Sequence, residues 1–231
     1  MRLVAWNANC GIRKNRTSEE VLDLLEPLQA DIVVVSEGPA NPKGATWSWR
    51  EDAAAKLSVW ARNGYSASLI KSDIAIPQSA LLHVRGPVEF ALAAVWPVEH
   101  GRLTYGGILR RVVDNYLPDG EATRTIIAGD LNSNTRVVAQ RSSHPKLVSS
   151  LSVRGLSSVY HHQESLAHGD ERTGTYRTGK LEFFLDYAFV PLGWLEAATL
   201  AVLRGPRWSL VSDHYPIVLD IPDATFRRIG P

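Results

Sequence analysis

The sequence predicts one α/β (α+β) domain with two β-sheets inside and helices outside. Two observations support this class. Short apolar runs typical of buried strands recur along the chain, and helical periodicity separates some of them. No linker or internal repeat divides the 231 residues, so we expect a single domain over residues 1–231. That length is sufficient to bury a full core.

The first forty residues predict a strand–helix–strand unit. Residues 2–6 form an apolar run, and residues 32–35 form a second one. Between them, Thr17 and Glu20 have the spacing of a capping box, which predicts a helix that begins near residue 17. Pro27 is expected in the last turn of that helix.

The rest of the chain predicts a strand meander, two helices and further strands. Residues 38–56 and 161–179 are rich in turn formers or polar residues, so we expect loops there. Helical periodicity predicts helices over 108–117 and 145–153. The expected strands span residues 57–67, 74–76, 80–84, 88–95, 125–128, 181–190, 195–203 and 215–221.

The composition excludes few functions, but it indicates the compartment in which the protein is expected. The net charge is +1, so a nucleic-acid partner is neither required nor excluded. The single cysteine, Cys10, cannot form an intramolecular disulfide. The apolar run at the N-terminus is too short for a signal peptide, and no run reaches the roughly 18 residues of a membrane span. We therefore expect a soluble cytoplasmic protein.

Polar side chains stand at the ends of apolar strands, or inside them. Asp130 and Asn132 follow the run 125–128, and they point the same way if the strand continues. Taken alone, this stretch fits a polar turn as well as it fits a functional site. The other positions with this pattern are Asn7 and Asn9, Glu37, Asp186, and Ser212-Asp213-His214.

Asp186 and His214 suggest a catalytic pair. Asp186 lies within an apolar run, and an unpaired carboxylate there would cost several kcal/mol. A structural role, with Arg177 or backbone N–H groups as partners, is one explanation. The other is that Asp186 holds His214, fixes its tautomer and raises its pKa.

The remaining oxygen-bearing side chains suit a hard cation. Carboxylates and amides are ligands for Mg²⁺ or Mn²⁺ rather than zinc. An acidic site with such a cation and a histidine is equipped for metal-assisted attack of water on phosphorus. The carboxylates are Glu37, Asp130 and Asp213, and the amides are Asn7, Asn9 and Asn132.

Two other groups of residues could carry chemistry. His161, His162, His168 and Asp170 could in principle hold zinc, although a solvated loop is the simpler interpretation. Cys10 could act as a nucleophile beside Asn9, although a packed thiol is the simpler interpretation.

Five motifs in order resemble the endonuclease/exonuclease/phosphatase superfamily, whose members include exonuclease III and DNase I. The motifs are W-N-x-N (6–9), S-E-G (36–38), G-D-L-N-S-N (129–134), L-D-Y-x-F (185–189) and S-D-H-Y-P (212–216). The resemblance covers residues 1–221. It implies a DNase I-like four-layer sandwich, in which two mixed β-sheets lie face to face and helices flank them.

The resemblance also implies roles. Glu37 would hold the metal, with Asn7, Asn9 and Asp213 close by. Asp130 would orient or deprotonate the attacking water, and Asn132 would position the water or the phosphate.

His214, held by Asp186, would stabilise charge on the phosphoryl oxygens, and Tyr105 would match a tyrosine that contacts phosphate. Asn7, Asn132 and Arg177 would bind the substrate. Separately from the resemblance, seven basic residues could line a cleft that takes a polyanion, and scattered surface charge is the alternative for each of them. They are Arg110, Arg111, Arg136, Arg141, Arg172, Arg177 and Lys180.

The sequence departs from the family pattern in two places. Trp96 and Pro97 stand where many phosphatase-like and DNase I-like members carry a histidine. The basic insertions of larger nucleases are absent, which weakens the case for duplex DNA.

We therefore expect a Mg²⁺- or Mn²⁺-dependent phosphodiesterase, a nuclease acting on DNA or RNA. Within the same superfamily, the alternatives are a phosphomonoesterase and a phospholipid or sugar-phosphate diesterase. An inactive binding module is the alternative from a different class.

Overall fold

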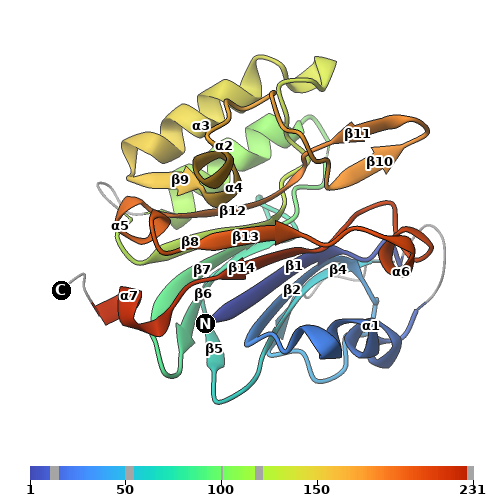
Figure 1. Cartoon of the computed structure of the whole chain (residues 1–231), viewed down its shortest axis with the longest axis vertical. Coiled ribbons are helices and arrows are strands. Elements are labelled where there is room, and N and C mark those ends of the chain that lie inside the picture. The colour runs from blue at the N-terminus through green and yellow to red at the C-terminus, as the bar shows by residue number, and fades with distance from the viewer. Residues whose placement is uncertain (11–15, 50–54, 100, 118–121, 228–231) are drawn as a thin grey trace.

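Two six-stranded β-sheets pack face to face, and helices cover their outer faces (Figure 1). The computed structural model describes residues 1–10, 16–49, 55–99, 101–117 and 122–227. This architecture confirms the predicted four-layer sandwich of two mixed sheets.

The first sheet has the strand order β13-β14-β1-β2-β4-β3. β1 and β2 are parallel, whereas β1 and β14 are antiparallel, so the sheet is mixed. The strands are β1 (Arg2–Asn7), β2 (Ile32–Gly38), β3 (Trp47–Ser48), β4 (Lys56–Ala61), β13 (Thr199–Val202) and β14 (Ile217–Asp220).

The second sheet has the order β5-β6-β7-β8-β12-β9, and a separate hairpin pairs β10 with β11. β7 and β8 are parallel, whereas β8 and β12 are antiparallel. The strands are β5 (Ser66–Lys71), β6 (Ser79–Arg85), β7 (Phe90–Val95), β8 (Thr125–Asp130), β9 (Leu156–Ser158), β10 (Tyr176–Thr178), β11 (Leu181–Phe183) and β12 (Asp186–Pro191).

Helices flank both sheets, and α1 lies on the opposite side of the sandwich from α2 and α3 (Figure 1). Within the described ranges, no helix is both long and apolar enough to span a membrane. The helices are α1 (Ser18–Leu25), α2 (Tyr105–Tyr116), α3 (Ser143–Val153), α4 (Val159–Glu164), α5 (Leu192–Leu195), α6 (Pro206–Ser209) and α7 (Asp223–Arg227), with 3₁₀ turns at Glu26–Leu28 and Val138–Gln140.

The start of α1 follows the predicted capping box. The Thr17 hydroxyl accepts the N–H of Glu20, and the Glu20 carboxylate accepts the N–H of Thr17. Such reciprocal bonds satisfy two N–H groups that a helix start otherwise leaves unpaired. Pro27 lies in the 3₁₀ turn that extends the helix, as expected from its missing N–H.

Alternating residues of β1 divide between two hydrophobic clusters. Leu3 and Ala5 face the large core between the sheets. Val4 and Trp6 face a smaller core with Val21 of α1. The period of two in a strand produces this division, and it leaves β1 buried on both faces.

Some predicted strands are interrupted. Residues 57–67 form two strands, β4 and β5, because Asn63 and Gly64 adopt φ values of +53° and +82° in a turn between them. Residues 181–190 likewise divide into β11 and β12, which pair with different partners.

Other predicted elements are replaced or displaced. Residues 74–76 form a turn, not a strand, and residues 192–195 form α5 ahead of β13. The predicted loop 38–56 contains β3, and its residues 50–54 lie outside the described part of the chain. The predicted loop 161–179 is wrong at both ends, since residues 161–164 belong to α4 and residues 176–178 form β10.

Candidate active site

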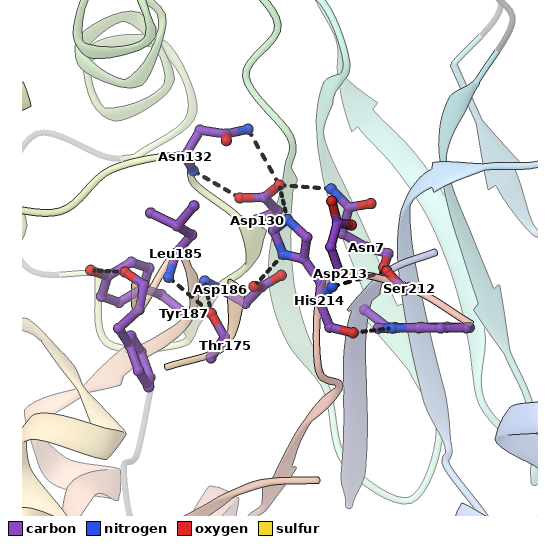
Figure 2. Close-up of polar contacts among 12 residues, drawn as sticks. Asn7, Asp130, Asn132, Thr175, Leu185, Asp186, Tyr187, Ser212, Asp213 and His214 are labelled. Atoms are coloured by element: carbon purple, nitrogen blue, oxygen red, sulfur yellow. Dashed lines mark hydrogen bonds and ion pairs between the residues drawn. The ribbon is translucent and has the colours of Figure 1, made fainter. Parts of the chain in front are cut away.

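Strands from both sheets end at one place and bring the predicted residues together (Figure 2). Asn7 is the last residue of β1, and Asp130 is the last residue of β8. Asp186 begins β12 and is the register partner of Asp130. His214 precedes β14 and bridges to Tyr176 of the hairpin.

Asp130 collects donors from two segments. Its Oδ2 atom accepts a hydrogen bond from Asn7 Nδ2 at 2.9 Å, and its Oδ1 atom accepts one from the backbone N–H of Asn132 at 2.9 Å. Asn132 Nδ2 lies 3.3 Å from Asp130 Oδ2. The condition that the strand continues to Asn132 is not met, because β8 ends at Asp130 and Asn132 has φ +48°. A turn places the two side chains in contact instead.

Asp186 and His214 form the expected pair. His214 Nδ1 lies 2.8 Å from Asp186 Oδ2, and both side chains are buried. Thr175 holds this end of β12, because its hydroxyl accepts the N–H groups of Leu185 and Asp186 (Figure 2). The other oxygen of Asp186 is buried and has no hydrogen-bond partner. The structure therefore does not pair Asp186 with Arg177.

The ring of His214 extends from Asp186 toward Asp130. Its Nε2 atom lies 3.9 Å from Asp130 Oδ2. Burial opposes the charged imidazole, but Asp186 and Asp130 raise the pKa of His214 to about 9. Burial raises the pKa of Asp130 to about 7, against the opposing effect of His214. A protonated imidazole therefore faces a carboxyl group that titrates near neutral pH.

Glu37 contacts Asn7 at the end of β1, and Asp213 contacts Asn9, which follows that strand. Asn7 Nδ2 donates to Glu37 Oε1 at 3.0 Å, and Asn9 Nδ2 donates to Asp213 Oδ1 at 2.6 Å. Glu37 and Asn9 adopt φ values of +43° and +49°. Non-glycine residues rarely adopt this left-handed region, and such conformations are concentrated at functional sites.

Gly129 allows β8 to pass close to the end of β7, and this places Asp130 at the site. Its φ is +140°, and a Cβ atom at this position would lie 2.1 Å from the carbonyl oxygen of Val95. Only glycine permits so close an approach of two backbones. The glycine of the G-D-L-N-S-N motif is therefore required by packing next to the site.

Tyr105 and Arg177 occupy different environments. Tyr105 begins α2, and burial raises its pKa, together with the charges of Glu99, Asp130 and Glu37. The guanidinium of Arg177 donates to the carbonyl groups of Ser209 and Ser212. The substrate-binding role of Arg177 stays a prediction, since these contacts already explain its position.

Further side chains support the site, and the sequence had given none of them a supporting role. The Tyr176 ring packs against the His214 ring with centroids 4.8 Å apart, and Trp6 Nε1 donates to the His214 carbonyl. The Ser212 hydroxyl donates to the Asn7 carbonyl and accepts the N–H of His214. Trp6 and Ser212 stand inside the quoted motifs, whereas nothing in the sequence marks Thr175 or Tyr176 as neighbours of the site.

Among the described residues, two groups of three histidine or acidic side chains lie close enough together to hold a metal ion. Asp130, Asp186 and His214 offer atoms within 4.8 Å of one another. These atoms already contact each other, and a protonated imidazole has no lone pair for a metal. The oxygen atoms around Glu37 fit a hard cation better, because the buried Oδ1 atom of Asn9 lacks a hydrogen-bond partner.

The second group corrects the expectation of a solvated loop. His161, His168 and Glu171 also offer atoms within 4.8 Å of one another. His161 is buried, whereas His162 lies 3.2 Å from Glu196 at the surface and Asp170 is exposed. Of the four residues that could in principle hold zinc, the structure brings His161 and His168 together and leaves His162 and Asp170 at the surface.

Cys10 is packed. Its side chain is buried, and burial raises the pKa of the thiol to about 11. A thiol in this state is a poor nucleophile at neutral pH.

Comparison with known proteins identifies the architecture. A family model described as the endonuclease/exonuclease/phosphatase family matches residues 4–214. A search of curated proteins finds no match.

Solved structures with the same fold include three proteins of low sequence identity. The endonuclease domain of TRAS1, a telomere-specific non-LTR retrotransposon, is 16% identical with a TM-score of 0.66, covering 95% of this chain and 97% of that one. TDP2 from D. rerio, solved with a single-strand DNA product, is 15% identical with a TM-score of 0.62 and coverages of 95% and 97%. The 3'-5' exonuclease NExo from Neisseria meningitidis is 14% identical with a TM-score of 0.61 and coverages of 96% and 99%.

Proposed function

The chain belongs to the endonuclease/exonuclease/phosphatase family, and we propose that it is a Mg²⁺- or Mn²⁺-dependent nuclease that hydrolyses phosphodiesters by direct attack of water. One observation carries this proposal: Asp130, His214 and Asp186 form a buried acid–base chain where strands of both sheets end. Hydrolysis of a phosphoester needs a group that accepts a proton and a group that stabilises negative charge on oxygen.

Asp130 is the base in this proposal. Burial raises its pKa to about 7, which is closer to the optimum for a general base at neutral pH than an ordinary aspartate. Asn7 and Asn132 bind its oxygens and fix its orientation. The proton of the attacking water passes to an Asp130 oxygen as the water oxygen bonds to phosphorus. The P–O ester bond opposite the water breaks at the same time, and the released alkoxide takes a proton from solvent.

His214 supplies positive charge. Asp186 and Asp130 raise the pKa of the imidazole to about 9, which favours its charged form at neutral pH, so the proposal assigns charge stabilisation to His214 and proton transfer to Asp130. Nδ1–H donates to Asp186, which leaves Nε2–H to donate to a phosphoryl oxygen. Asp186 is therefore a positioning residue that fixes the ring and favours its charged form.

Glu37 and Asp213, with the amide oxygen of Asn9, would hold the divalent cation. The set is all oxygen, as Mg²⁺ and Mn²⁺ prefer, and the Asn9 oxygen has no other partner. When bound, the cation supplies Lewis-acid stabilisation of negative charge on the phosphate. Tyr105, whose hydroxyl stays protonated because its pKa is raised, would donate to the phosphate.

A nucleic-acid substrate is supported by the kinds of neighbours and by local charge. TRAS1 and NExo are named as nucleases, and TDP2 was solved with DNA. Beside the β10–β11 hairpin, one cavity is lined by the basic residues Arg136, Arg172 and Lys180, together with the carboxylates Glu171 and Glu182. Arg111, another basic residue that the sequence suggested for the cleft, donates a hydrogen bond to the backbone carbonyl of Ala75.

A substrate panel tests the proposal. Plasmid, single-stranded DNA, abasic-site DNA, RNA, an aryl phosphodiester and inositol phosphates would each be incubated with Mg²⁺, Mn²⁺ or EDTA. We expect metal-dependent cleavage of a nucleic acid that is lost in Asp130→Ala. Activity on a monoester alone would reassign the protein to a phosphatase. Turnover that persists in EDTA and in Asp130→Ala would refute the mechanism.

A further inference from the structure

A second buried cluster lies where α3, α4 and the segment 165–175 meet. His144 of α3, His161 of α4, and His168 and Glu171 of the segment contact one another. The proposed hydrolysis uses none of these residues. The segment has no regular secondary structure of its own, and side-chain contacts add to the few backbone hydrogen bonds that its ends make with α4 and β11.

Three of these residues, His161, His168 and Glu171, are candidate metal ligands. Each of them uses one of its side-chain atoms to contact a neighbouring group that orients it. His161 Nδ1 lies 2.8 Å from Ser158 Oγ, and His168 Nδ1 lies 3.0 Å from His144 Nε2. Glu171 Oε1 accepts the N–H of Gly169 at 2.9 Å and an Asn134 amide N–H at 3.1 Å. Metal-binding histidines and carboxylates are normally fixed by such outer contacts.

His144, which orients His168, is itself fixed. Its Nδ1 atom lies 2.9 Å from Ser133 Oγ. Ser133 and Asn134 both belong to the G-D-L-N-S-N stretch that carries Asp130. The cluster is therefore connected to the loop of the candidate active site by two side chains.

The remaining ligand atoms point to a cation. Glu171 Oε2 is buried and lacks a hydrogen-bond partner, and the Glu171 side chain is only 2% exposed. A buried carboxylate oxygen without a donor is costly unless a cation is present. His161 Nε2 lies 3.1 Å from Glu171 Oε1, close to the separation of two ligands on one small ion.

We propose that His161, His168 and Glu171 bind one first-row transition-metal ion, such as Zn²⁺, and fasten the segment 165–175 to α4. Two imidazole nitrogens and a carboxylate are a ligand set for zinc, with a fourth position left for water. The oxygen-only donors around Glu37 favour Mg²⁺, so the two sites would select different ions. The inference does not rest on the proposed nuclease activity.

Coordination requires a movement. The His161 and His168 rings stack with centroids 3.6 Å apart and 16° between their planes. A metal lies in the plane of each imidazole that binds it, so one ring must turn for both to bind the same ion. His168 is the ring expected to turn, because it is carried by the segment without regular structure.

Zinc titration of the full chain tests this site. The protein would be stripped with EDTA, exchanged into buffer with excess Mg²⁺ to fill the oxygen site, and titrated with ZnCl₂ by calorimetry. We expect one zinc ion per chain and a melting temperature that rises by about 5 to 10 °C at a hundredfold excess over Kd. Absence of binding by the wild-type chain would refute the site.

Variants locate the ion. His161→Gln, His168→Gln and Glu171→Gln should each weaken zinc binding by at least about tenfold, as expected when a ligand or its contacts are lost. His162→Gln is the matched control, since this neighbouring histidine pairs with Glu196 at the surface, and it should bind zinc like the wild type. Equal affinity in all four variants would refute the assignment.

A second measurement avoids variants that fail to fold. In the wild-type chain, zinc should shift the imidazole NMR signals of His161 and His168 and leave those of His83 and His162 unchanged. Shifts confined to His162 or to His214 would place the zinc elsewhere and overturn the proposal.

Discussion

Replacing Asp186 with asparagine should lower both the charge on His214 and the rate of hydrolysis. Asp186 Oδ2 accepts the Nδ1–H of His214 at 2.8 Å, and Asp186 is fully buried. Asparagine keeps the shape but removes the negative charge that favours the imidazolium. The Asp186→Asn variant should therefore have a His214 pKa well below the wild-type value of about 9.

The magnitude follows from the lost bond. A hydrogen bond between charged groups contributes about 1.5 to 3 kcal/mol. At about 1.36 kcal/mol per tenfold change in rate, its loss lowers kcat by about 10- to 150-fold if the bond acts fully in the transition state. The change should appear in kcat rather than KM, because Asp186 reaches the substrate only through His214.

Two assays separate the effects. An NMR titration of His214 gives its pKa in the EDTA-treated wild type and in Asp186→Asn, and steady-state kinetics with Mg²⁺ give kcat and KM. Asp220→Asn is the control, because Asp220 pairs with Arg2 at the partly exposed end of β14. An unchanged His214 pKa with kcat within twofold of wild type would refute the assigned role of Asp186.

Three further outcomes are expected. Gly129→Ala should lower the free energy of unfolding by more than about 3 kcal/mol, because the added Cβ atom would collide with the Val95 carbonyl. A denaturant titration measures this loss, and the control Gly44→Ala, at a position with φ +68° and open space around it, should cost far less. In EDTA, protonated His214 should stabilise the fold fully below pH 6.5, the ordinary pKa of histidine, and this contribution should disappear as the pH rises to about 9. The stability difference between wild type and His214→Gln should shrink over that interval, and a constant difference would contradict the raised pKa. Cys10 should resist thiol reagents at pH 8 until the protein unfolds, since its pKa is about 11; rapid native labelling would contradict its burial.

Local sequence signals that agree with one another predicted the fold and several of the residues that come together at the site. The apolar runs of β1, β2 and β8 lie where expected, and the capping box begins α1. Asp130 and Asp186 come together because they are register partners on the neighbouring strands β8 and β12, and His214, which precedes β14 of the facing sheet, meets them there. The catalytic and metal-binding roles of these residues stay predictions.

Elements fixed by turns or by tertiary contacts were predicted less well. The break between β4 and β5 had a local signal, the Asn63-Gly64 dipeptide, which is typical of tight hairpin turns. The break between β11 and β12 had none, because it follows from pairing with different strands. The buried cluster was hidden for the same reason, since His144 and Glu171 become partners of His161 and His168 only in the folded chain.

The rate of phosphodiester hydrolysis in Asp130→Ala tests the central claim most directly. The account assigns proton transfer to Asp130, and general base catalysis typically contributes about 10²- to 10⁴-fold. With the best nucleic-acid substrate, saturating Mg²⁺ and neutral pH, kcat should fall by about that factor. Asp114→Ala, an exposed carboxylate of α2, should keep the wild-type rate. A folded Asp130→Ala protein that hydrolyses the substrate as fast as the wild type would contradict the account.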